Sequence, residues 1–93
     1  MYTTSIKYDG QLRTICKHNY SNSNLITDAP IDNMGKGESF SPTDLVVTAL
    51  GSCILTIMGI YCQNNKLKFD TASIDVLKVM DSNPRRISKI DLN

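Results

Sequence analysis

The sequence has little of the chemistry that would hold a metal ion or a framework of disulfides. Only one histidine, His18, and three cysteines occur among its 93 residues. An odd number of cysteines does not form a closed set of disulfides, and no two of them make the CxxC pair that is typical of structural zinc sites. We therefore expect reduced thiols, no metal and no cofactor.

The chain also lacks clustered charge and an apolar leader. Ten Lys and Arg residues balance nine Asp and Glu residues, and Arg85-Arg86 is the only basic doublet. This scatter argues against a nucleic-acid partner. The first ten residues contain no apolar stretch of the secretory type, and the longest apolar stretch, near residues 45–61, is interrupted by glycine, serine and threonine. The sequence thus predicts a cytoplasmic protein without a membrane span.

Two strands are expected near the N-terminus, over residues 2–8 and 12–20, with a turn around Asp9-Gly10. The loop could contain two or three residues. We favour three, with Tyr8 opposite Leu12, because one face of the hairpin must be buried and a slip of one residue would turn that face outward. This register gathers four side chains on one face: Ile6, Tyr8, Leu12 and Cys16.

The clearest element is a helix that begins after Ser41. Serine is a preferred N-cap, Pro42 fits the first helical position, and the charge of Asp44 suits the positive end of the helix. The helix should continue to about residue 65, where two asparagines end it. Its apolar residues occur on all sides, which predicts a helix that is buried on most sides.

The remaining elements are shorter. A third strand is expected near residues 25–27, followed by an irregular loop over residues 28–40. Thirteen residues without regular structure is long for a compact domain, and such loops are often functional. Two further strands are expected over residues 69–81 and 86–92, so the sequence indicates an α+β protein.

Three residues within the helix indicate close packing. Gly51 and Gly59 lower its helix propensity, which suggests that another segment lies against them. Cys53, taken alone, is typical of core packing, because cysteine is among the most buried residue types. It lies about three turns into the helix, where the field of the helix dipole has faded. A reactive thiolate here would need a cation or a hydrogen-bond donor from elsewhere.

Four segments, taken in order, resemble the signature of the OsmC/Ohr family, which is named after osmotically inducible protein C and organic hydroperoxide resistance protein. They are DAP at residues 28–30, GKGE at 35–38, FSPTDL at 40–45 and ALGSC at 49–53. The most specific part is the ALGSC segment with the SP helix start before its cysteine. The likeness covers most of the chain.

The resemblance implies an OsmC-like α+β fold, in which a curved antiparallel sheet wraps around a long central helix within an intertwined homodimer. Residues 1–93 would form a single OsmC-like domain that lacks the C-terminal third of the family. The family reduces organic hydroperoxides or hydrogen peroxide, in defence against oxidative stress. Its reactive cysteine aligns with Cys53, which would become a sulfenic acid. A thiol reductant such as dihydrolipoamide would reset it.

The chain departs from the family pattern at two partners of that cysteine. The peroxidases use a glutamate just after the helix-start proline, where this chain has Thr43. Its only glutamate, Glu38, lies on the preceding loop and is a catalytic candidate without a positional match; the alternative is a solvated loop charge. The family also uses an N-terminal arginine, for which Arg13 is the candidate, although the favoured hairpin register turns it away from the face of Cys16.

The third departure is the absence of a resolving cysteine, which the family carries in its C-terminal third. Cys62 lies on the same helix as Cys53, about 13 Å further along the axis and on the opposite face, too far for a disulfide. Cys16 stays possible, although a buried strand position explains it as well. Two alternatives therefore stay open: a non-catalytic OsmC-like dimer that binds an apolar small molecule, and an inactive fragment with the family fold.

Overall fold

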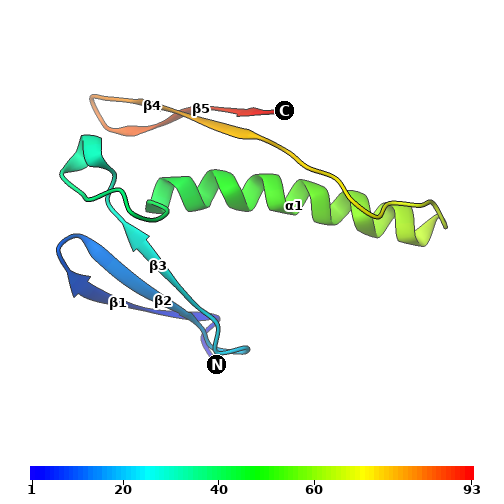
Figure 1. Ribbon diagram of the computed structural model, residues 1–93, viewed down its shortest axis with the longest axis horizontal. Helices are drawn as coiled ribbons and strands as arrows, with labels where there is room; N and C mark the ends of the chain where they lie inside the picture. Colours follow the sequence, from blue (N-terminus) through cyan, green and yellow to red (C-terminus); the bar gives the residue numbers. More distant parts are fainter. The chain divides into compact units, whose positions relative to one another are not determined.

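The computed structural model describes all 93 residues, and Figure 1 shows its elements. The chain divides into two compact units, residues 1–43 and 44–93. The elements in chain order are β1 (Thr4–Gly10), β2 (Arg13–His18), β3 (Asn24–Asp28), the 3-10 helix η1 (Ile31–Asn33), α1 (Pro42–Asn64), β4 (Val76–Asp81) and β5 (Arg86–Leu92).

The first unit contains the expected hairpin, but the predicted register is wrong. Tyr8 stands opposite Thr14 rather than Leu12, and a bulge lies between Tyr8 and Gly10. The turn is made by Gln11 and Leu12, whose φ angles of 56° and 62° are both positive, as a type I′ turn requires. Neither residue type is typical of that turn, so the sequence pointed to the Asp9-Gly10 pair, two residues too early.

The first three strands form one antiparallel sheet in the order β1-β2-β3. Because side chains alternate along a strand, Cys16 shares a face with Ile6, its partner on β1. Arg13 lies on the opposite face, as predicted, and stands directly opposite Asp28 of β3. The sheet therefore brings a guanidinium and a carboxylate together on one face.

The irregular loop expected over residues 28–40 is confirmed in part, because Asp28 ends β3 and Ile31–Asn33 form η1. Backbone hydrogen bonds tie its ends together. The Asp28 N–H donates to the Phe40 carbonyl at 2.9 Å. A side chain at Gly35 would overlap the backbone carbonyl of Ala29, so only glycine allows this close approach. The loop is thus a closed structure that begins and ends beside the end of β3.

In the second unit, α1 has the predicted extent and both of its glycines contact the segment that follows the helix. A Cβ atom at Gly51 would lie 3.0 Å from Val76 Cγ2, and one at Gly59 would lie 3.7 Å from Phe69 Cδ1. The predicted close packing is confirmed at Gly51, whereas the contact at Gly59 is an ordinary van der Waals contact. Figure 1 shows this segment returning along α1 before β4 begins.

The last two strands form a separate antiparallel pair, β4-β5. The strand over residues 86–92 is confirmed, whereas the one expected over 69–81 forms only at Val76–Asp81. Val76 pairs with Leu92, and the backbones of Asp75 and Asn93 exchange two hydrogen bonds. Residues 69–74 lie beyond the end of β5, so they have no neighbouring strand with which to form a ladder.

Most of α1 is exposed in the single chain, where only Val47 and Gly51 of this helix are buried. The prediction of a helix buried on most sides is therefore wrong for the single chain. By length and composition alone α1 could cross a membrane, a test that the core helix of a soluble protein also passes. It is longer than the apolar stretch in the sequence, because it extends three residues beyond 45–61 at each end.

Candidate functional site

Cys53 lies on the side of α1 that the rest of the second unit leaves open. Its thiol is free and its side chain is exposed. Gly51, which contacts Val76, is displaced from Cys53 by about 160° around the helix, so the two residues lie on opposite faces. The neighbours of Cys53 on its own face include Ile57 and Ile60, which are also exposed. An accessible thiol therefore stands among exposed apolar side chains.

An ion pair fixes the start of α1 to the following hairpin. Asp44 Oδ1 lies 2.7 Å from Lys78 Nζ of β4, and the Lys78 side chain is only 16% exposed. The sequence indicated Asp44 only as a partner of the helix dipole. Its contact with Lys78 could not be read from the sequence, because it depends on how β4 packs against the helix.

The first unit brings two of the three candidate catalytic residues together. Arg13 Nη2 donates to Glu38 Oε1 at 2.8 Å, and it also donates to Asp28 Oδ2 at 3.0 Å. Glu38 is thus a solvent-exposed loop charge that also pairs with Arg13. Sequence reasoning missed Asp28 as a functional candidate, although it begins the DAP segment, because its pairing with Arg13 follows only from the observed strand register.

Asp28 is the most completely enclosed charged residue of this cluster. The residue is fully buried, and its Oδ2 atom accepts hydrogen bonds from Arg13 and from the Glu38 backbone N–H at 3.0 Å. Oδ1 is buried without a hydrogen-bond partner in the chain. The hydrogen bond from Arg13, followed by that from the Glu38 backbone, lowers the pKa of Asp28 below its ordinary value. Asp28 therefore stays ionised opposite the guanidinium.

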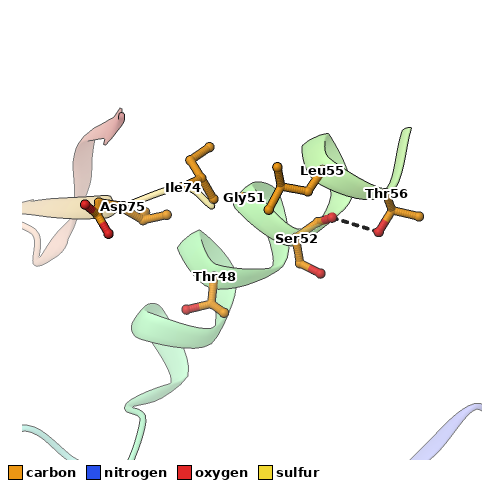
Figure 2. A pocket seen from close by; sticks show the side chains of 8 residues that line it. Thr48, Gly51, Ser52, Leu55, Thr56, Ile74 and Asp75 are labelled. Atoms are coloured by element: carbon orange, nitrogen blue, oxygen red, sulfur yellow. Dashed lines mark hydrogen bonds between the residues drawn. The ribbon is translucent and has the colours of Figure 1, made fainter. Parts of the chain in front are cut away.

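A cavity of about 500 Å³ lies within the second unit, between α1 and residues 74–76. Figure 2 shows the aliphatic side chains of Leu55 and Ile74 beside the polar side chains of Thr48 and Ser52. The full lining is Thr48, Gly51, Ser52, Leu55, Thr56, Ile74, Asp75 and Val76. Cys53 is not part of this lining, so the cavity and the thiol occupy different sides of the helix.

The comparison with protein families decides the identity of the chain, because residues 35–93 match the model of the OsmC-like proteins. The chain belongs to the OsmC family. A solved structure from Psychrobacter arcticus, described as an osmotic stress induced and detoxification response protein, is 48% identical with a TM-score of 0.94. The match covers 99% of this chain and 67% of that one. A search of curated proteins found no match.

Membership of the OsmC family confirms the resemblance and the α+β OsmC-like fold, and it connects the chain with osmotic or oxidative stress response. The match to the family model includes the ALGSC segment with Cys53 but begins after Arg13. The structural match extends over the N-terminal sheet as well. Peroxidase activity, the homodimer, the reductant and the cytoplasmic location stay predictions.

The other residues considered from the OsmC pattern make local contacts. Thr43, at the position of the family glutamate, places its hydroxyl 3.2 Å from that of Ser41. His18 Nδ1 lies 2.6 Å from the Ser21 hydroxyl at the end of β2, which explains it as a structural residue. Cys16 is half-buried in β2 and Cys62 half-buried in α1. No group of side chains in the chain could hold a metal ion.

Proposed function

We propose that the protein is a thiol-dependent peroxidase that reduces organic hydroperoxides or hydrogen peroxide in defence against oxidative stress. One observation carries the proposal: Cys53 ends the ALGSC segment within the residues that match the OsmC-like model, and by resemblance this is the family's reactive position. Cys16 and Cys62 have neither the family position nor the same exposure. The apolar neighbours of Cys53 suit the alkyl group of an organic hydroperoxide better than hydrogen peroxide.

The oxidative step needs Cys53 as a thiolate. Its sulfur attacks one peroxide oxygen, the S–O bond forms as the O–O bond breaks, and the alkoxide leaves and takes up a proton from water. Sulfur is oxidised to sulfenic acid and the peroxide is reduced to an alcohol. Because Cys53 lies beyond the reach of the helix dipole, a cation must stabilise the thiolate. By family resemblance we assign this role to Arg13.

The reductive step is assigned to an external thiol. Cys62 is nine residues from Cys53 on one helix, which excludes a direct disulfide between them. A dithiol such as dihydrolipoamide would attack the sulfenic sulfur, release water and form a mixed disulfide. Its second thiol would then displace the Cys53 thiolate and close the disulfide of the reductant. No resolving cysteine is needed for this cycle.

The assay that tests the proposal is consumption of cumene hydroperoxide with dihydrolipoamide as the reductant. Wild-type protein and Cys62→Ser should consume the peroxide, whereas Cys53→Ser should fall to the rate of the reductant alone. Cys62→Ser is the matched control, because it removes a half-buried thiol from the same helix. Full activity of the Cys53→Ser variant would refute the proposal.

The cavity beside α1 favours a second candidate function, the binding of an apolar small molecule without catalysis. Its volume of about 500 Å³ lies within the range of ligand pockets, and aliphatic side chains with a few hydroxyls line it. Since Cys53 lies outside this lining, such binding would not need the thiol. Ligand binding that survives Cys53→Ser, in a protein without peroxidase activity, would favour this candidate.

A further inference from the structure

The two carboxylates that contact Arg13 differ in their access to solvent. The Asp28 side chain has an exposed fraction of 0%, whereas that of Glu38 is 64% exposed. Water competes for the Glu38 carboxylate, and an exposed ion pair holds its partners weakly. The Asp28 carboxylate has no such competitor, and charge-assisted hydrogen bonds are stronger when they are removed from water.

Asp28 is also fixed by its backbone. It stands opposite Arg13 in the β2-β3 ladder, and its N–H donates to the carbonyl of Phe40. Its Oδ2 atom accepts the backbone N–H of Glu38 as well as the guanidinium. A movement of this carboxylate would therefore break its hydrogen bond from the Glu38 backbone in the 28–40 loop. Glu38 reaches Arg13 only through its own flexible side chain.

We infer that Asp28 is the residue that positions the Arg13 guanidinium, while Glu38 is an exchangeable partner. This inference rests on the proposed function, in which Arg13 stabilises the Cys53 thiolate. Asp28 would also take the place of the family glutamate, because this chain has Thr43 at that position. The carboxylate that orients Arg13 would then come from the end of β3 and not from the start of α1. Asp28 acts through Arg13 and is a positioning residue.

The geometry leaves Arg13 able to act on a further group. Both hydrogen bonds to the carboxylates come from Nη2, so Nε and Nη1 stay available to donate to an anion such as a thiolate. The Arg13 side chain is 30% exposed. The carboxylates therefore orient the guanidinium through Nη2 and leave Nε and Nη1 for another acceptor.

The first test measures how firmly Arg13 is held, independently of Cys53. Rotation of the Arg13 Nη2 group and solvent exchange of its hydrogens, which make both contacts with the carboxylates, would be followed by nitrogen-15 NMR in the wild type, Asp28→Asn and Glu38→Gln. Asp28→Asn should accelerate exchange by about tenfold, since it removes a buried charged partner, and Glu38→Gln by less than about threefold. Equal acceleration in the two variants would overturn the inference.

The second test measures the effect on Cys53 through the pH dependence of its alkylation by iodoacetamide. Asp28→Asn should move the profile to higher pH, toward that of Arg13→Gln, and Asp9→Asn serves as a control at an exposed aspartate of the same unit. If Arg13 loosens in Asp28→Asn while the Cys53 profile stays in place, the inference stands and the proposed role of Arg13 at the thiolate fails.

If Asp28→Asn does not fold, a pH titration of the wild-type protein tests which carboxylate positions Arg13. The signal of the Arg13 Nη2 group would be followed from neutral to acid pH. The titratable and charged groups that face Arg13 and Asp28 are Glu38 and Lys36. The signal should change mainly below the ordinary range of an aspartate, where Asp28 protonates. A signal that does not change below the ordinary range of an aspartate would overturn the inference.

Discussion

At the scale of single residues, the proposed chemistry depends on one thiol and one guanidinium. Cys53 ends the ALGSC segment that carries the family resemblance and is exposed in the single chain, but its own helix offers no charge that would ionise it. Arg13 is a cation whose Nη2 atom is shared between two carboxylates. The proposed activity therefore depends on side chains from segments 40 residues apart in the sequence.

The acid stability of the fold should report on Asp28. Its pKa is lower in the folded chain than its ordinary value of about 3.9, so the unfolded chain takes up the proton first as the pH falls. The stabilisation that Asp28 provides is therefore complete above its ordinary pKa. It is lost as the pH falls through the lower pKa that Asp28 has in the folded chain. Urea unfolding measured between pH 7 and pH 2 should show that the free energy of unfolding falls more steeply with decreasing pH for the wild type than for Asp28→Asn. Parallel curves would contradict this account.

At the scale of elements, local signals identified most of the secondary structure. The Ser41-Pro42 start set the first turn of α1, and the strands β2, β3 and β5 lie where their sequences indicated. The hairpin register failed because Gln11 and Leu12 adopt a turn that their residue types disfavour. The strand predicted at residues 69–74 does not form, because no neighbouring strand pairs with this segment. The local sequence does not show whether such a partner exists.

The candidate site was predictable to a similar degree. Cys53 could be found from the ALGSC segment, because its spacing from the SP helix start carries the family likeness. Arg13 and Glu38, the two weaker candidates, are in contact, which the sequence did not predict, and their catalytic roles stay predictions. Asp28 could not be found, since its place opposite Arg13 depends on the strand register.

The two glycines of α1 should respond differently to alanine. At Gly59 the new Cβ atom would have ordinary contact with Phe69, at 3.7 Å, so Gly59→Ala should stabilise the fold by about 1 kcal/mol through helix propensity. At Gly51 the Cβ would lie only 3.0 Å from Val76, and the displacement of Val76 should cancel much of that gain. Urea unfolding of both variants measures the difference, and equal stabilisation would show that the contact at Gly51 is not tight.

At the scale of the whole molecule, the chain presents more apolar helix surface than one copy covers. Val46, Ile57 and Ile60, all near Cys53 on the helix, are each more than half exposed, and an apolar patch of this kind marks an interaction surface. The chain is also small, so its own core stabilises it only marginally. We propose that a second copy covers this face in a homodimer.

Sedimentation equilibrium at micromolar concentration tests the homodimer. The wild-type protein should have twice the mass of one chain, and Ile57→Lys should shift it toward the monomer, because it places a charge in the apolar face. Lys68→Glu, at an exposed position outside that face, is the control and should leave the mass unchanged. A stable monomer of the wild type would contradict the proposed assembly.

The most direct measurement of the central claim is the trapping of the oxidised cysteine. The wild-type protein would be treated with one equivalent of cumene hydroperoxide in the presence of dimedone, which captures sulfenic acids, and the adduct located by mass spectrometry. The account predicts labelling at Cys53, the thiol that aligns by resemblance with the family's reactive cysteine and lies within the residues that match the OsmC-like model. Labelling at Cys16 or Cys62 with Cys53 untouched would contradict it.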